Sequence, residues 1–189
     1  MSSSPDQNSK PYNVSGDLLL SILNARNGVA RTNRFNVIFT VPSKIRNLVK
    51  SQEEISIACE TCSLPMRGIH AVDYAPFRQP YKIPTGYSNE DVAFTFLITG
   101  DMYLRTLFDA WTDLIVDHES YRMLYREDYT ADITIEQLDS NNLVVYAVKL
   151  FNAWPAAVSP LMLDSTSTDQ HHKMSVSITY EDYDILTTK

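Results

Sequence analysis

The chain has 189 residues and a mass of 21.5 kDa, enough for one compact domain with an arm. With 44% hydrophobic and 21% charged residues, its composition excludes intrinsic disorder and collagen-like repetition. The formal net charge of −7 disfavours a general affinity for nucleic-acid phosphates. Apolar runs are too short to span a bilayer, and no signal peptide pattern opens the sequence. Two cysteines predict no disulfide framework and favour synthesis in a reducing cytoplasm.

The charge is distributed unevenly along the chain. Residues 1–50 hold seven Lys or Arg against two Asp or Glu, whereas the remaining residues hold nine against 21. A basic leading segment joined to an acidic body is compatible with head-to-tail self-association, in which each arm meets a neighbouring body. Chance clustering with local salt bridges is an equal alternative, because exposed ion pairs contribute little.

The first residues predict an arm that carries one short helix. Residues 1–15 are rich in Ser, Asn and Pro and predict a flexible tail. Asp17 is expected to cap a helix, and Asn27-Gly28 is expected to end it. The apolar stripe of this helix consists of Leu18, Leu19, Ile22 and Leu23. We therefore expect an arm over residues 1–29 and a β domain over 30–189.

The next part of the chain predicts strands separated by a polar stretch. The expected strands cover residues 35–41, 55–59 and 69–74, with one or two helical turns over 43–50. For the second strand, Ile55, Ile57 and Cys59 alternate with Ser56 and Ala58, a half-buried pattern.

Residues 75–91 have no hydrophobic period and contain three prolines and a glycine, which predicts a long loop. Phe77, Tyr81 and Tyr87 lie between these breakers. Such aromatic side chains favour contact with another chain, although packing on the parent domain is the commoner outcome.

The clearest elements follow the loop. A spacing of two between apolar residues predicts a strand over 92–98, and a helix is then expected to begin at Gly100-Asp101, with Asp101 as its cap. Its apolar face consists of Leu104, Leu107, Phe108, Trp111, Leu114 and Ile115.

Three further strands are expected near the C-terminus. They cover residues 132–136, 143–151 and 174–180, and the turn at 139–142 joins the first two. The total is about eight strands, one long helix and one short helix, without βαβ alternation. This order predicts a mainly β fold of two packed antiparallel sheets, a sandwich or barrel, with the long helix flanking it.

Candidate chemical sites are weak. Cys59-Glu60-Thr61-Cys62 has no further Cys or His at ligand spacing, so two reduced cysteines beside a core strand are expected rather than a metal or redox site. His171-His172 is expected in an exposed loop. Asp109, Asp113 and Asp117 are expected to form a solvated helix face rather than a cation site.

No enzyme signature is present in the sequence. It holds no GxGxxG, Walker A or GxSxG motif and no evident pair of catalytic carboxylates. We therefore expect no catalytic residue, cofactor or metal. The remaining alternative is a small β-rich hydrolase or ligand-binding module that uses residues 75–91 as a lid and stays monomeric.

A set of segments in fixed order carries a family resemblance. These segments are ARTNRF at 30–35, IACETCSLP at 57–65, KIP at 82–84, DMYLRTLFDAW at 101–111, ITIEQLD at 133–139, LFNAWP at 150–155 and VSITYEDY at 176–183. In order and spacing they resemble the tail tube proteins of contractile-tailed bacteriophages, over residues 30–184.

The resemblance implies two packed antiparallel sheets with a flanking helix. It also implies hexameric rings that stack head to tail into a hollow tube of the virion tail, without membrane insertion. Sheath and baseplate proteins are the implied partners, and DNA passes through without specific binding. The segment before residue 30 and the stretch 43–50 are longer than a minimal family member needs. The resemblance therefore leaves open a major tube subunit, a baseplate tube initiator or hub, and a secretion-system tube subunit.

Under this resemblance, residues can be assigned to surfaces. A DNA conduit should repel phosphates, and Asp132 and Glu136, on the polar face of one strand, are our candidates for the lumen; the outer surface is the alternative. The expected subunit contacts are Arg31, Arg34, Tyr81, Lys82 and Tyr87.

Overall fold

The computed structural model describes residues 16–25, 28–75, 79–166 and 171–186, in two units, Met1–Asn33 and Arg34–Lys189. The tail expected over residues 1–15 lies outside the described residues, as does Asn27.

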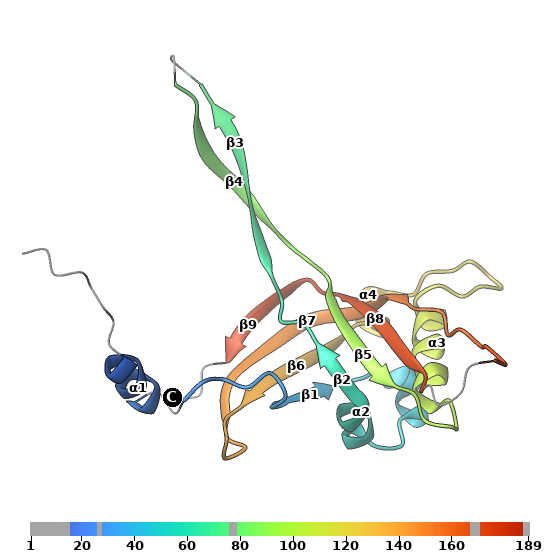
Figure 1. Cartoon of the computed structure of the whole chain (residues 1–189). Coiled ribbons are helices and arrows are strands. Elements are labelled where there is room, and N and C mark those ends of the chain that lie inside the picture. The colour runs from blue at the N-terminus through green and yellow to red at the C-terminus, as the bar shows by residue number, and fades with distance from the viewer. Residues whose placement is uncertain (1–15, 26–27, 76–78, 167–170, 187–189) are drawn as a thin grey trace, which may run out of the picture. The chain divides into compact units, whose positions relative to one another are not determined.

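The first unit contains the short helix that the sequence predicts. Helix α1 spans Gly16–Ala25 (Figure 1), so Asp17 lies inside the helix and not at its cap. Gly28 has a φ of +86°, and its N–H donates to the Leu23 carbonyl at 2.6 Å. A glycine in the left-handed region is a common helix ending, as expected here.

The second unit contains all strands of the described residues and three α-helices. Its elements are β1 Phe35–Phe39, the 3₁₀ helix η1 Ser43–Leu48, α2 Gln52–Ala58, β2 Cys59–Cys62, β3 Arg67–Tyr74, β4 Tyr81–Asn89, β5 Val92–Leu97, α3 Tyr103–Ile115, α4 Arg126–Tyr129, β6 Ala131–Leu138, β7 Val144–Val158, β8 Lys173–Thr179 and β9 Asp182–Leu186. No helix of the described residues is long and apolar enough to cross a membrane.

Most of these strands belong to one folded antiparallel sheet. Its order is β1-β6-β7-β8-β5-β2, and β9 pairs with β7. The long strand β7 serves both halves, because its first part pairs with β6 and β9 and its last part pairs with β8. The sheet folds so that β1 faces β5, and the ring centroids of Phe39 and Phe94 are 5.1 Å apart. The two halves thus form the expected packed antiparallel fold.

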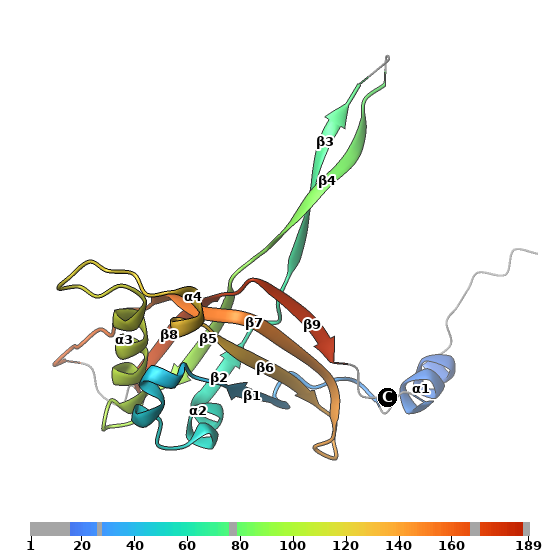
Figure 2. The same ribbon diagram turned by 180° about the vertical axis from the view of Figure 1, so that it is seen from behind.

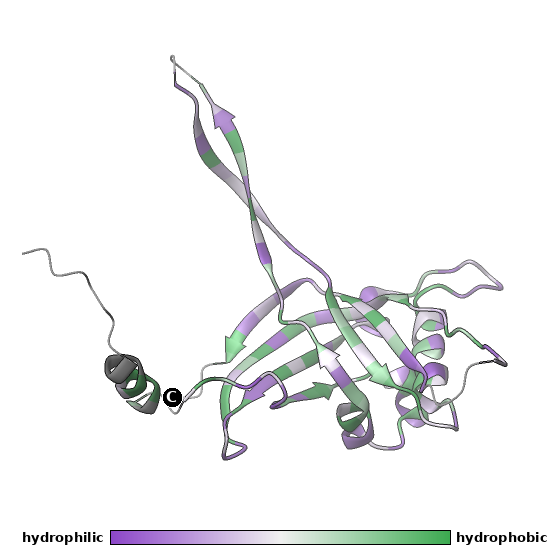
Figure 3. Ribbon diagram, viewed as in Figure 1, coloured by the Kyte–Doolittle hydropathy of each residue, from purple (hydrophilic) through white to green (hydrophobic). Residues whose placement is uncertain are grey.

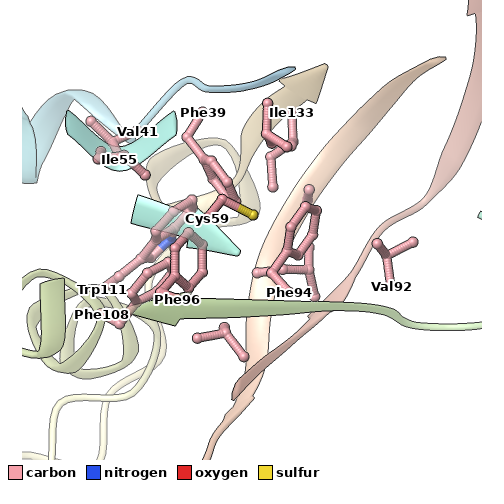
Figure 4. Close-up of a cluster of buried hydrophobic side chains, with 14 of the residues drawn as sticks. Phe39, Val41, Ile55, Cys59, Val92, Phe94, Phe96, Phe108, Trp111 and Ile133 are labelled. Atoms are coloured by element: carbon pink, nitrogen blue, oxygen red, sulfur yellow. The ribbon is translucent and has the colours of Figure 1, made fainter. Parts of the chain in front are cut away.

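The core lies between the two halves and α3 (Figure 4). Phe39 from β1 contacts Phe96 from β5 and Phe108 from α3, at centroid distances of 5.6 and 6.3 Å. Trp111 is fully buried, and its indole N–H donates to the Tyr129 carbonyl at 2.7 Å. The predicted apolar face of the long helix is confirmed, and this face holds the helix on the sheet.

The prediction of a strand over residues 55–59 is wrong, because α2 occupies most of this segment. The Ser51 hydroxyl accepts the Glu53 N–H at 3.1 Å and caps the helix. Ile55 is 1% exposed, Ile57 is 83% exposed and Cys59 is 7% exposed. The apparent alternation of apolar residues therefore spans the buried face of α2 at Ile55, an exposed isoleucine at 57, and the first residue of β2 at Cys59.

The prediction of a loop over residues 75–91 is also wrong in large part. Strands β3 and β4 form a separate two-stranded hairpin. His70 pairs with Gly86 and Ala71 pairs with Pro84, which leaves Thr85 as an extra residue on β4. Proline is tolerated in a strand at such a bulge, where the ladder is already interrupted.

Two smaller differences concern a helix cap and the last strand. Helix α3 begins after Met102, which has a φ of 53°, so Asp101 is not its N-cap. The Asp101 carboxylate still accepts the Tyr103 N–H, at 3.3 Å. Strand β9, which follows β8 after two residues, was not expected from the sequence.

Candidate functional site

The hairpin of β3 and β4 extends away from the sheet (Figures 1 and 2), and hydrophobic positions occur along both of its strands (Figure 3). Several large apolar side chains of the hairpin are exposed. These are Ile69, Val72, Tyr74, Tyr81, Ile83 and Tyr87. A lone two-stranded ribbon has no core of its own and is marginally stable in water. Exposed large apolar side chains gathered on one projecting ribbon favour contact with another molecule. Since the segment projects as a ribbon, it is not the lid that the enzyme or binding-module alternative requires.

Three of the predicted subunit contacts lie on this hairpin. Tyr81 is 54% exposed, and its ring meets the Tyr74 ring edge-on at 5.5 Å. Lys82 is exposed and stands opposite Asp73 in the ladder. Tyr87 is 55% exposed near the base of the ribbon. These side chains give the hairpin a mixed aromatic and charged surface, which suits a protein–protein interface.

The two predicted arginine contacts lie elsewhere in the chain. Arg31 is an exposed residue of the first unit. Arg34 opens the second unit, and its guanidinium donates to the Asn142 side chain at 2.7 Å. Its carbonyl accepts the Leu138 N–H at 2.9 Å. Arg34 therefore already closes the β6–β7 turn within its own chain.

The two predicted lumen acids share the outward face of β6. Asp132 and Glu136 are half-buried and alternate with the core residues Ile133 and Ile135. An Asp132 oxygen lies 2.8 Å from the Lys149 ammonium. A Glu136 oxygen accepts from the Asn36 amide at 3.0 Å.

A third acid on this face was missed from the sequence. Asp184 of β9 is exposed and pairs in register with Lys149 of β7. It was missed because β9 itself was not expected. We call the outward surface of β6, β7 and β9 with Asp132, Glu136 and Asp184 the acidic face.

The cysteines have the chemistry of core residues. Burial raises the pKa of Cys59 to about 12 and that of Cys62 to about 11. Both thiols are free and protonated at neutral pH, so they are poor nucleophiles and poor metal ligands. Among the described residues, no three His, Cys, Asp or Glu side chains gather at ligand distances.

The three aspartates that follow helical spacing have separate partners. Asp109 pairs with Arg105 at 2.9 Å, and Asp113 lies 3.7 Å from His118. The hydroxyl of Ser120 donates to Asp117, which lowers the pKa of Asp117. The three carboxylates therefore have separate partners and do not form one cluster. His171 and His172 lie outside helices and strands; His171 is exposed and His172 is half-buried.

The comparison with family models decides the family. Residues 30–186 match the model described as phage tail tube protein. The chain belongs to the phage tail tube protein family. This match nearly coincides with the range of the sequence resemblance. As a member of this family, the protein is a structural component of a tail tube.

Individual relatives agree with this membership. The tail tube protein of Serratia phage KSP90 is 23% identical over 156 residues, which cover 81% of this chain and 86% of that protein. A chain in the baseplate of the anti-feeding prophage is 16% identical with a TM-score of 0.61, over 84% of this chain and 96% of its own. A chain in the extended sheath-tube complex of the extracellular contractile injection system PVC is 14% identical with a TM-score of 0.59, over 85% and 93%. The two structures share the fold of this family member.

Proposed function

We propose that this tail tube family member forms hexameric rings that stack head to tail into the inner tube of a contractile phage tail, through which DNA leaves the capsid. The observation that carries the proposal is the projecting hairpin with its unpartnered apolar side chains, in a chain whose residues 30–186 match the family. The hairpin supplies an interface that a monomer leaves in water, and a second subunit would bury it.

The contacts proposed for assembly are Tyr81, Lys82 and Tyr87 on the hairpin, Arg31 of the first unit and Arg34 of the second unit. The neighbours would be copies of this chain, and the outer partners would be sheath and baseplate proteins. Relatives in a sheath-tube complex and in a baseplate support this choice of partners.

The acidic face is proposed to line the lumen. Phosphates moving past Asp132, Glu136 and Asp184 would be repelled rather than bound, so DNA would slide without a brake. The net charge of −7 per subunit, repeated around a ring, supports such a wall.

A second candidate function keeps the fold and changes the position in the tail. The similarity to a chain of the anti-feeding prophage baseplate favours a tube initiator or hub, which forms a ring that does not extend alone. A secretion-system tube subunit would share the ring but carry a different cargo.

Electron microscopy of the purified chain over a concentration series tests these functions. Tubes or stacked rings with a central hole support the major tube subunit, whereas isolated rings support the initiator or hub. A monomer at every concentration, also in the presence of preformed baseplates, would contradict assembly.

A paired set of variants tests the role of the hairpin. Tyr81→Ser with Ile83→Ser removes exposed apolar surface from the hairpin, and assembly is expected to be lost while circular dichroism is unchanged. Tyr121→Ser with Met123→Ser is the matched control, because these side chains are 83% and 70% exposed in the loop after α3. Equal loss of assembly in both variants would argue against the hairpin as the specific contact.

A further inference from the structure

The base of the hairpin is attached to the sheet chiefly by polar and aromatic contacts. Arg67, the first residue of β3, donates from Nη2 to an Asp182 oxygen at 2.5 Å. Its guanidinium carbon also lies 4.6 Å from the centroid of the Tyr87 ring and 4.8 Å from that of the Tyr183 ring. One side chain thus joins β3, β4 and β9.

The second strand is attached at the same level. Asn89, the last residue of β4, is the ladder partner of Arg67, and its side-chain amide donates to the Glu181 carbonyl at 2.9 Å. Glu181 is held in turn, since one of its side-chain oxygens accepts from Asn152 at 2.6 Å and lies 3.1 Å from Arg126. The base of the hairpin is therefore bonded to β9 through Arg67 and to Glu181, just before β9, through Asn89.

We propose that Arg67 is a positioning residue for assembly: with Asn89 it forms a base latch that sets the direction of the hairpin before a neighbouring subunit binds. The proposal rests on the proposed function, in which the hairpin contacts neighbours. The physical reason is leverage. The eight residues of β3 extend about 26 Å, so a swing of about 20° at the base moves the tip by about 9 Å. A hairpin with a fixed direction loses less conformational entropy when a neighbouring subunit binds it.

Arginine suits this position better than lysine. The Arg67–Asp182 ion pair is partly exposed, so the pair alone contributes little. The planar guanidinium also lies over two aromatic rings, and a lysine ammonium cannot stack in this way. Arg67→Lys therefore keeps the charge and tests the geometry.

Distances between spin labels test the latch in the full chain below its assembly concentration. Labels on Asp73→Cys in β3 and Asn141→Cys in the β6–β7 turn report the direction of the hairpin. Labelling at pH 7 favours these exposed cysteines, because the native thiols have raised pKa values. Lys44→Ala is the matched control, since Lys44 and Asp128 form an ion pair of similar exposure at 3.1 Å.

We expect one narrow distance in the parent and in Lys44→Ala, and at least a doubled width in Arg67→Ala and Arg67→Lys. The concentration needed for assembly should rise about tenfold in Arg67→Ala, the change that corresponds to about 1.4 kcal/mol. Amide hydrogen exchange of β3 and β4 distinguishes two cases. In a hairpin that only swings, the β3–β4 backbone amides stay protected from exchange, whereas in an unfolded hairpin they do not.

An unchanged distance width in both Arg67 variants would overturn the latch. A doubled width of the distance distribution with an unchanged assembly concentration would overturn the positioning role of Arg67. Loss of amide protection in the β3–β4 ladder would overturn it too. If the parent itself never assembles, the proposed function fails, and the distance widths still decide whether the latch exists.

Discussion

Single polar side chains join segments of this protein that are distant in sequence. Asp101 accepts hydrogen bonds from Thr99, from the Lys50 ammonium at 2.9 Å and from the Tyr103 N–H at 3.3 Å. These donors, Thr99 first, lower the pKa of Asp101 to about 2. The carboxylate is solvent-exposed, so it holds the start of α3 to the stretch after η1 without burial of charge. The associated stability is present above about pH 4 and is lost as the pH falls toward 2.

The buried thiols should react slowly in the folded protein. At pH 8 we expect Cys59 and Cys62 to react with an aromatic disulfide reagent more than about tenfold slower in the folded than in the denatured chain, because little thiolate forms. Absorbance of the released thiolate in buffer and in denaturant measures both rates. Fast labelling of the folded chain would contradict the burial of Cys59 and the partial burial of Cys62.

Stability should fall in alkaline solution. Burial raises the pKa of Tyr180 to about 12, in the same direction as the shifts of the two cysteines. The unfolded chain releases these protons at lower pH than the folded chain, so the unfolding free energy declines as the pH rises from about 9 to about 12. Urea titrations at a series of pH values measure this decline. Tyr180→Phe should reduce the slope above pH 10, and an unchanged slope would remove Tyr180 from the explanation.

At the level of elements, a hydrophobic pattern predicts the structure where the element packs on the core. The strands β1, β5, β6 and β8 and the helix α3 each bury one face, so their apolar residues follow a period. Helix α2 buries little besides Ile55, so its capping serine was a better signal than its apolar residues. Strand β4 has no core to face, and therefore its sequence shows no period, whereas the strand expected over residues 69–74 lies within β3.

The N-cap of α2 should contribute measurably to stability. Ser51→Ala removes the acceptor for the Glu53 N–H and is expected to lower the unfolding free energy by about 1 kcal/mol. Urea denaturation measures the loss. Ser140→Ala, in the exposed β6–β7 turn, is the control and should stay within about 0.5 kcal/mol of the parent. Equal effects of both changes would argue against the cap.

At the level of the whole molecule, the core and the arm belong to different units. Every residue of the buried cluster follows Arg34, and the sheet closes without the first unit.

Deletion of residues 1–30 should separate folding from assembly. We expect the thermal midpoint of the shortened chain to stay within a few degrees of the parent, because its core is intact. Stacking or ring closure is expected to be impaired, as seen by electron microscopy and sedimentation. Unchanged assembly would eliminate the arm as a contact, and loss of the folded state would show that α1 supports the sheet.

Charge reversal on the acidic face tests whether this face lines the lumen of the proposed tube, because a basic lumen wall should retain DNA. Assembled tubes of Glu136→Lys with Asp184→Lys are expected to hold short duplexes protected from nuclease, with retention that falls as salt rises. The control Asp113→Lys with Glu119→Lys makes the same charge change near the end of α3. DNA bound to this control should remain accessible to nuclease and be degraded. Equal protection in both variants would place the acidic face outside the lumen.

The sequence by itself determined the mainly β class, the long flanking helix, the turn between β6 and β7, and the family resemblance. These features rest on local propensities and on the burial of one face of each element, which leave a regular pattern in the residues. Only the tertiary structure decided the fold of the sheet across β7, the projection of the hairpin and the joining of Arg67 to β9. Each of these depends on contacts between residues far apart in the chain. No local pattern encodes such contacts, because their energy arises only after the sheet has folded.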